Sequence, residues 1–268
     1  MFRFLLKPRW IALGLFALVM TGLCVRLGFW QLDRLDGRRY FNHRYEAGMT
    51  AAPEPVERLV DAGGDLLYRQ AEATGTYDPA REVILYGRTN QGEPGNHVLT
   101  PLRLPDGRAL LVDRGWVPFA MDTPPVAAAA PAPGTVSVTG LLAPSEPGGT
   151  PQDAGTITTV TRPDLQRIGQ QLPYPLVPYY LQLRTQVPAQ AGDLPIPPPV
   201  PTLDEGPHLS YALQWFAFAA IAGCGFALLV WREVRDGRAR ADRPEGASPE
   251  DDGSEPADVH GADTQPAR

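Results

Sequence analysis

The chain has 268 residues, a formal net charge of −6 and 2 cysteines. The segment 33–207 and the tail 241–268 each hold more acids than arginines, so neither presents the basic surface that a nucleic-acid backbone requires. We therefore expect no nucleic-acid partner. A copper or zinc chaperone is also disfavoured, because no Cys-x-x-Cys pair or Cys/His cluster is present.

An uncharged run from Trp10 to Val25, which continues as apolar sequence after Arg26, predicts a first transmembrane helix over residues 10–32. Arg26 lies about 24 Å along such a helix, where its long side chain can reach the polar interface. The alternative is a cleaved signal peptide, because residues 1–9 are basic. The run is longer than a signal-peptide core and lacks a small-x-small cleavage site, so we expect an uncleaved anchor.

The segment 33–207 predicts one mainly antiparallel β domain with a core of ordinary size. Short β-branched and aliphatic runs predict strands at 82–86, 98–104, 109–113, 135–142, 156–161 and 179–186. The Pro-Asp-Gly turn at 105–107 joins two of these strands into a hairpin. Among the remaining segments, we expect a short helix over 164–172, surface loops at 120–133 and 144–151, and an extended Pro-rich spacer at 194–201.

A second uncharged run, from Leu209 to Trp231, exceeds as a helix the roughly 30 Å hydrocarbon core of a bilayer. It predicts a second transmembrane helix over residues 208–231. The remaining segment, 232–268, begins with a cluster of arginines and ends in acidic, Pro- and Gly-rich sequence. Such a composition cannot bury enough apolar surface to fold, so we expect a disordered acidic tail.

Two spans place both termini on the same side of a membrane, with residues 33–207 on the other side. The basic residues in 1–9 and the arginines after residue 231 favour cytoplasmic ends. Four arginines just beyond the first span count against this orientation, namely Arg34, Arg38, Arg39 and Arg44. Because long loops cross largely regardless of charge, we keep both termini cytoplasmic and the β domain extracytoplasmic. The fold expected is therefore an α+β membrane protein, multi-pass in the plasma membrane, whose two transmembrane helices flank one β domain.

Four segments in this order resemble the Surfeit locus protein 1 family. They are Gly-Phe-Trp-Gln-Leu-Asp-Arg at 28–34, Val-Asp-Arg-Gly-Trp-Val-Pro at 112–118, Pro-Tyr-Tyr-Leu-Gln at 178–182, and Pro-His-Leu-Ser-Tyr-Ala-Leu-Gln-Trp-Phe at 207–216. Members of this family are assembly factors of haem–copper cytochrome c oxidase. The resemblance covers about residues 10–231 and implies a helix, a β-rich domain and a helix. It also implies a role in maturing the haem-bearing catalytic subunit, with haem a as the cofactor handled and haem a synthase as a second partner.

His208, at the start of the second span, is the candidate ligand for haem iron, because a neutral imidazole is a standard axial ligand. Helical spacing places Tyr211 and Trp215 on the same face. The other side chains assigned to this haem a site are Trp30, Gln31 and Arg34. Arg34 could pair with a haem propionate or with a lipid phosphate, because a guanidinium suits both anions, and lipid contact is the simpler explanation. The alternative is that His208 and its aromatic neighbours are ordinary residues of a membrane interface, in contact with lipid.

Arg114, Gly115 and Trp116 end a predicted strand, where glycine permits a close backbone approach and tryptophan provides an anchor. Recognition of a partner protein and stiffening of a turn both explain this motif, and both remain open. His97, in contrast, stands without other metal-ligand residues near it in sequence. We expect it to be hydrogen-bonded rather than metal-bound.

No enzymatic activity is expected. The segment 33–207 holds no cysteine and no lysine, and the chain has no Gly-x-Ser-x-Gly, His-Glu-x-x-His or phosphate-loop motif. The function predicted is a membrane-anchored oxidase assembly factor that assists haem a insertion. Two alternatives remain. One is a structural chaperone or scaffold of the oxidase that binds no haem. The other is a two-span extracytoplasmic sensor or binding module, although the tail supplies no folded transmitter.

Overall fold

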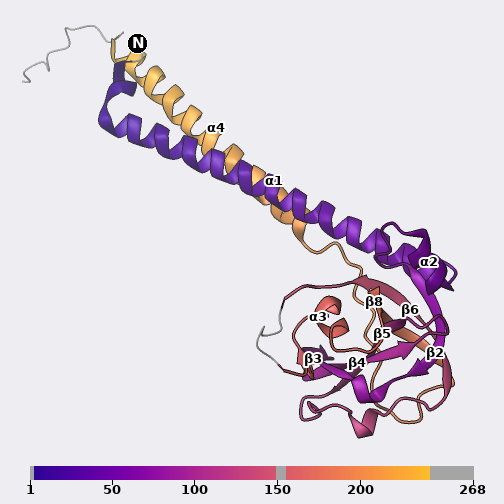
Figure 1. The fold of residues 1–268 in the computed structure, drawn as a ribbon. Helices are drawn as coiled ribbons and strands as arrows, with labels where there is room; N and C mark the ends of the chain where they lie inside the picture. Colours follow the sequence, from indigo (N-terminus) through magenta and orange to yellow (C-terminus); the bar gives the residue numbers. More distant parts are fainter. Residues whose placement is uncertain (1–2, 149–154, 242–268) are drawn as a thin grey trace, which may run out of the picture. The chain divides into compact units, whose positions relative to one another are not determined.

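The computed structural model describes residues 3–148 and 155–241. These residues fall into two compact units, which we take separately (Figure 1). The first unit combines the start of the chain, through Gln31, with the segment from Ser210 onwards. The second unit runs from Leu32 to Leu209 and contains the sheet.

The first unit is built from the apolar parts of α1 (Pro8–Thr50) and α4 (His208–Ala241), with a short 3-10 helix, η1 (Arg3–Leu6), before α1. Helices α1 and α4 are each long and apolar enough to cross a membrane. Their large apolar side chains are mostly exposed, among them Phe16, Leu18 and Ile221. Such continuous exposure of apolar surface is characteristic of an interface with lipid or protein.

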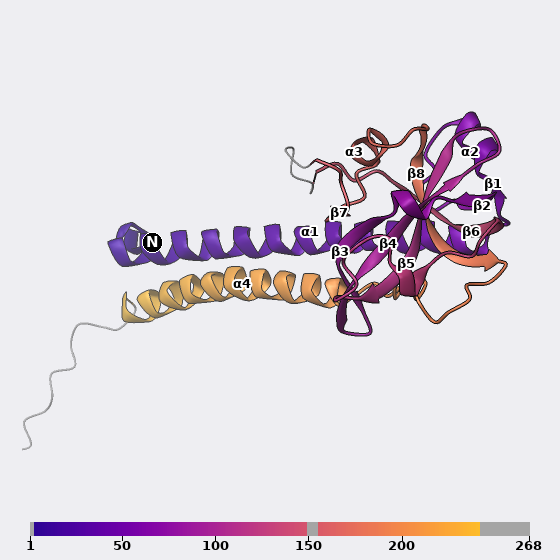
Figure 2. The same cartoon turned by 60° about the horizontal axis from the view of Figure 1, so that its bottom comes forward.

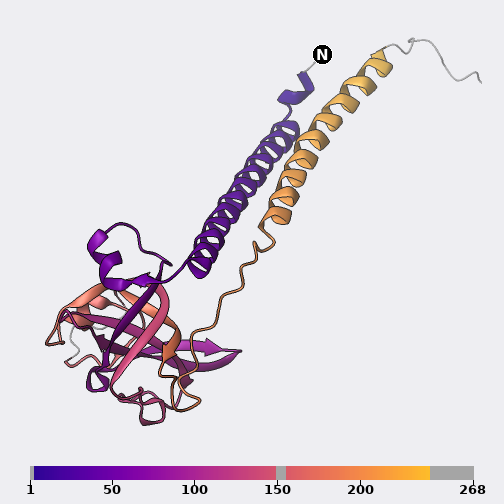
Figure 3. The same cartoon turned by 90° about the vertical axis from the view of Figure 1, so that its right-hand side faces the viewer.

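Helices α1 and α4 pack against each other where glycines lie opposite phenylalanine rings. A Cβ added at Gly28 would lie 2.6 Å from the ring of Phe216, and one at Gly14 would lie 3.1 Å from the ring of Phe226. The rings of Phe29 and Phe216 meet edge to face, with centroids 5.4 Å apart. These pairings run in opposite chain directions, so α1 and α4 pack antiparallel within this unit (Figures 1 and 3). Small residues thus let the two helices approach closely, as expected for membrane helices.

Both helices extend beyond the spans predicted from sequence. Helix α1 continues past residue 32 to Thr50, because charged side chains end an apolar span without opposing a helix. It ends shortly before Pro53, which disfavours helical backbone at the preceding residue. Helix α4 begins at His208 as predicted but continues past residue 231 to Ala241. The rest of the predicted acidic tail, 242–268, lies outside the described residues.

The second unit is a mixed sheet accompanied by short helices. Its strands are β1 (Glu54–Pro55), β2 (Gln70–Tyr77), β3 (Val83–Asn90), β4 (Glu93–Arg103), β5 (Ala109–Pro118), β6 (Thr135–Pro144), β7 (Thr159–Val160) and β8 (Leu176–Val187). The short helices are α2 (Val56–Ala62), η2 (Pro79–Arg81), η3 (Ala127–Ala129) and α3 (Leu165–Gly169). An α+β unit of this kind agrees with the class expected from sequence.

Among the described residues the strands follow the order β1-β2-β6-β8-β5-β4-β3-β7, and a further pairing of β2 with β4 closes five of them into a ring (Figure 2). The closing pairs are Thr76 with Arg103 and Tyr77 with Leu102. Antiparallel pairings predominate, but β1–β2, β5–β8 and β3–β7 are parallel. The sheet is therefore mixed rather than uniformly antiparallel.

Several predicted elements are confirmed. The hairpin of β4 and β5 turns at the expected Pro-Asp-Gly, and the strands at 82–86, 135–142 and 179–186 appear as parts of β3, β6 and β8. The run at 156–161 is wrong as a full strand, because only the two residues of β7 pair with β3. Strand β2 was missed, since its inward positions are small residues such as Ala71 and Ala73, which give a weak strand signal.

The main hydrophobic core lies between α2 and strands of the ring. Buried leucines and valines of β4, β5, β6 and β8 form it, including Leu102, Val112, Val138 and Leu181. A second cluster forms where α3 covers strands β3, β5 and β8, with Ile168 and Leu111 fully buried. Both clusters depend on strands of near-continuous apolar sequence, which explains why those strands were predictable.

The segment between β8 and α4 pairs with β5 through one pair of backbone hydrogen bonds. The N–H of Trp116 donates to the carbonyl of Ile196 at 2.7 Å, and the N–H of Ile196 donates to the carbonyl of Trp116 at 2.9 Å. Gly115, with φ of +124°, makes the approach possible, because a Cβ there would lie 1.9 Å from the Ile196 carbonyl oxygen. We call this contact the Trp116–Ile196 bridge.

We expect Gly115→Ala to lower the thermal midpoint of the full chain by about 10 °C. The new Cβ both strains the backbone and opens the Trp116–Ile196 bridge, at a combined cost of about 3 kcal/mol, and each kcal/mol shifts a domain of this size by about 2–4 °C. The matched control is Gly107→Ala, since Gly107 also has positive φ, +87°, but has nothing within 4 Å of an added Cβ. That variant should lose only about 3 °C. Equal losses in the two variants would show that the bridge adds nothing.

Candidate functional site

The residues predicted to bind haem a lie on the two long helices. Trp30, Gln31 and Arg34 belong to α1, and His208 is the first residue of α4, followed within two turns by Tyr211 and Trp215. His208 is half-buried, and its ring carbon Cδ2 is 3.5 Å from the position that a Cβ on Gly206 would occupy. Tyr211 is 47% exposed and Trp30 is 41% exposed. An imidazole at the start of an apolar helix fits an axial ligand chemically, and the haem site itself stays a prediction.

The chain that leads into His208 is fixed by side chains from the end of α1 within the second unit. Arg38 donates from Nε to the carbonyl of Asp204 at 3.0 Å and from Nη2 to the carbonyl of Thr202 at 2.9 Å. Asn42, one turn further on, donates from Nδ2 to the carbonyls of Leu203 and Asp204 at 3.0 and 3.1 Å. Consecutive carbonyls of an irregular segment are therefore satisfied by one helix face.

Arg39 completes this contact through its ion pair with Glu205. Its guanidinium makes two parallel hydrogen bonds to the carboxylate, at 2.8 and 2.9 Å. The hydrogen bond from Arg39 lowers the pKa of Glu205, and the bidentate geometry fixes both side chains in orientation. We call Arg38, Arg39 and Asn42, with the residues 202–205 that they hold, the linker clamp. It ends three residues before His208.

Sequence reasoning missed the linker clamp. In the sequence, Arg38 and Arg39 were interpreted only as positive charges that count against the expected membrane orientation. The available signal was their spacing, because Arg38 and Asn42 are four residues apart and lie on one face if the helix continues past residue 32. The predicted helix ends at residue 32, before Arg38 and Asn42, so the sequence prediction contains no helix face that could carry the clamp.

The motif Arg114-Gly115-Trp116 is buried in the sheet unit. Arg114 is 1% exposed and Trp116 is 5% exposed. Arg114 Nη1 lies 3.6 Å from Glu82 Oε2, and its guanidinium sits 5.4 Å from the centre of the Tyr77 ring. The motif makes the Trp116–Ile196 bridge through the backbone of Trp116. Stiffening of a turn and recognition of a partner both stay predictions for this motif.

Glu82, the acid beside Arg114, is buried and accepts two further hydrogen bonds. The N–H of Val126 donates to Oε1 at 2.8 Å, and the hydroxyl of Thr100 donates to Oε2 at 3.1 Å. Burial raises the pKa of Glu82 and lowers the pKa of Arg114, so each group resists its charged form on its own. The two charges depend on each other and on the donors around Glu82.

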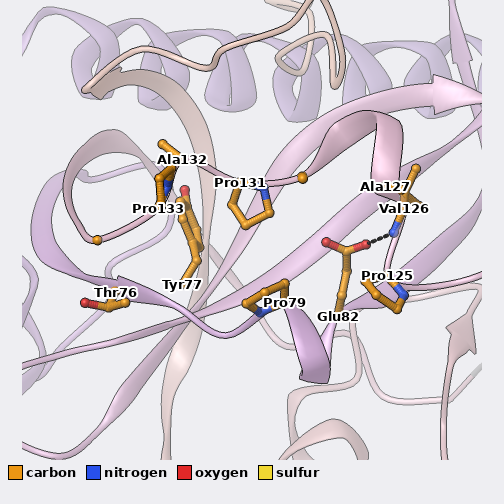
Figure 4. Close-up of a pocket in the computed structure, with 12 residues that line it drawn as sticks. Thr76, Tyr77, Pro79, Glu82, Pro125, Val126, Ala127, Pro131, Ala132 and Pro133 are labelled. Atoms are coloured by element: carbon orange, nitrogen blue, oxygen red, sulfur yellow. Dashed lines mark hydrogen bonds between the residues drawn. The ribbon is translucent and has the colours of Figure 1, made fainter.

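Glu82 also lines an open cavity of about 410 Å³. Figure 4 shows its carboxylate among Pro79, Pro125 and Pro131, with Tyr77 beyond them. Eight of the twelve lining residues are proline, alanine or valine, and the tyrosine hydroxyl is already hydrogen-bonded to Gln186 at 3.0 Å. This cavity offers an apolar surface with one acid that is largely satisfied.

His97 is hydrogen-bonded, as expected from sequence. Its Nδ1 lies 2.9 Å from Asp113 Oδ2, and Asp113 Oδ1 accepts the N–H of Gly115 at 3.1 Å. Both side chains line a cavity of about 310 Å³, together with Tyr180 and Glu146. Across the described parts of the chain, no group of three or more His, Cys, Asp and Glu side chains is arranged to hold a metal ion.

We expect Arg38→Ala to loosen the linker clamp locally without unfolding the sheet. Two charge-assisted hydrogen bonds are lost at an exposed position, where they contribute about 1 kcal/mol together. Cleavage before Asp204 by an Asp-specific protease should therefore become about fivefold faster. Arg58→Ala, an exposed arginine of α2, is the matched control and should leave this rate unchanged. An unchanged rate in Arg38→Ala would mean that the clamp does not restrain the linker.

Comparison with known proteins assigns the sequence of the chain to a family. The SURF1 family model matches residues 18–220. An uncharacterized SURF1-like protein of Mycobacterium tuberculosis is 32% identical over 258 residues, which cover 92% of each chain. A SURF1-like protein of Rickettsia felis is 28% identical over 212 residues, covering 77% of this chain and 91% of the relative. The matched region holds the whole sheet unit and parts of both long helices, and the chain belongs to the SURF1 family.

Proposed function

We propose that this protein is a membrane-anchored assembly factor for haem–copper cytochrome c oxidase. The observation that carries the proposal is the family match over residues 18–220, which begins inside α1 and ends inside α4. A match of that extent includes the whole sheet unit and part of each apolar helix. Both helices have the length and composition of membrane spans, which supports an anchored protein. No chemical reaction is part of the proposal.

The finer proposal is that the protein assists insertion of haem a into the catalytic subunit of the oxidase. Haem a, as the cargo, supplies an iron that accepts an axial ligand. His208 would provide the imidazole, and Tyr211 and Trp215 would provide aromatic surface on the following turns of α4. From α1, Arg34 would pair with a propionate, while Trp30 and Gln31 stand one turn before it.

The linker clamp supports this assignment of His208. An axial ligand must be presented in a defined orientation, yet His208 follows a segment with no helix or strand. The clamp fixes residues 202–205 through carbonyl and carboxylate contacts, so little free chain remains before the imidazole. In the same proposal, haem a synthase would supply the cargo and the oxidase catalytic subunit would receive it, with the protein in the plasma membrane.

For topology we expect both termini in the cytoplasm and the sheet unit outside it. A reporter fused after Arg238 should be active only in the cytoplasm, and a reporter inserted at Ala128, in the 3-10 helix η3, should be active only outside. The basic residues at both ends give this orientation its physical reason. If both positions report the same compartment, the two-span arrangement is wrong.

For haem binding we expect His208→Ala to remove bound haem a while leaving the protein abundant in the membrane. Truncating one half-buried side chain barely changes the apolar drive for insertion, whereas it removes the iron ligand. The measurement is the visible spectrum of protein purified in mild detergent from cells that make haem a. His43→Ala is the matched control, since His43 is an exposed histidine of α1 and should keep wild-type occupancy.

The alternative without haem binding gives a different result. If His208→Ala co-purifies with haem a at wild-type occupancy, the axial-ligand assignment fails. Oxidase assembly that still depends on the protein would then favour a scaffold acting through the sheet unit. Arg34→Ala should lower haem retention only in part, because the iron bond remains when one propionate contact is lost.

A further inference from the structure

A small cavity in the sheet unit brings together two arginines. It has a volume of about 130 Å³ and lies between the end of β5, the end of β8 and the segment that follows β8. Of the residues that line it, Arg114 and Pro195 are buried, whereas Thr185, Ala189 and Pro197 are exposed, and we call these three its rim. The cavity is therefore reachable from the surface and large enough for a ligand with a few non-hydrogen atoms.

Three buried nitrogen atoms of these two arginines have no hydrogen-bond acceptor. Arg114 donates from Nη2 to Gln190 Oε1 at 2.8 Å, but its Nε and Nη1 are buried and have no hydrogen-bond acceptor. Arg184 donates from Nη1 to the carbonyl of Pro198 at 2.5 Å and from Nη2 to the hydroxyl of Tyr45. Its Nε is also buried without an acceptor. Unsatisfied buried N–H groups are rare in native proteins and call for a partner.

The charges are also unbalanced. No acidic side chain lines the cavity. Glu82 is 3.6 Å from Arg114 but already accepts hydrogen bonds from Thr100 and Val126, and within the described residues no carboxylate lies at ion-pair distance from Arg184. A buried guanidinium is costly unless an anion accompanies it. Two guanidinium groups thus share, at most, the charge of one carboxylate.

We propose that this cavity binds a small oxyanion, the size of phosphate or of a carboxylate group, between Arg114 and Arg184. Guanidinium groups suit both anions, because their planar N–H pairs match two oxygens at once. Gln190 and Gln186 also line the cavity; their amide nitrogens already donate to the carbonyls of Ala130 and Pro188, and each carries a second N–H. The oxyanion would balance the charge and satisfy the orphaned Nε–H groups. The proposal is independent of haem binding and of the oxidase.

The test uses the full chain in detergent and follows thermal unfolding by tryptophan fluorescence. Inorganic phosphate and acetate are titrated separately, with sodium chloride at matched ionic strength as the reference. A saturable rise of about 3–6 °C at ten times the dissociation constant is expected for at least one of them. A response to phosphate alone identifies a phosphate ligand, and a response to acetate alone identifies a carboxylate. No rise above chloride for either anion overturns the proposal.

Substitutions locate the site. Arg184→Gln should weaken the anion's apparent affinity about tenfold or more, because a charge-assisted contact is lost. Arg58→Gln makes the same charge change on α2, outside the cavity, and should keep wild-type affinity. If the anion stabilises Arg184→Gln and wild type equally, it binds elsewhere and the proposal is wrong.

A second pair of variants covers the case in which Arg184→Gln does not fold. Ala189 is exposed at the rim, so a longer side chain there can be accommodated. Ala189→Glu places a tethered carboxylate beside the arginines, and Ala189→Gln is its isosteric neutral control. We expect Ala189→Glu to raise the midpoint in anion-free buffer above that of Ala189→Gln and to abolish the response to added anion. Equal midpoints and equal responses would overturn the proposal.

Discussion

The Trp116–Ile196 bridge is the contact that fixes the course of the chain between β8 and α4. Between Val187 and His208 the described residues contain no helix or strand, so their path is set only by individual contacts. The bridge fixes the middle of this path to β5. On one side of it, Gln190 meets Arg114, and on the other, Pro198 meets Arg184. Because these contacts share one short segment, loss of the bridge would weaken them together rather than singly.

The stability of the sheet unit is sensitive to the loss of either member of one buried charge pair, Arg114 and Glu82. Arg114 and Glu82 are both almost fully buried, and burial works against the charged form of each. Removing one partner would leave an uncompensated charge, which is far more costly than the pair is beneficial. The same arginine lines the small cavity and donates through Nη2 to Gln190 in the segment that follows β8. One side chain therefore links the charge balance of the sheet to the path of the chain towards α4.

The sequence predicted elements that depend on local pattern and missed those that depend on distant contacts. The β4–β5 hairpin has a turn signal between two apolar runs, and both long helices have uncharged runs, so all three were predictable. Strand β2 alternates cleanly but buries mainly small residues, which carry little strand preference. For the site, His208 at the start of α4 was predictable from the apolar run that follows it. The linker clamp was not, because its pairs are more than 160 residues apart in sequence.

The arginines beyond the first span acquire a structural reason from these contacts. Arg38 and Arg39 bind the linker, while Arg44 pairs with Asp65 at 2.5 Å and donates to the carbonyl of Leu67 at 3.1 Å. Arg38, Arg39 and Arg44 thus have acceptors within the sheet unit, so folding needs explain these cations whichever side of a membrane the sheet unit occupies. Charge counts near a span carry information about orientation only when the cations have no such partners.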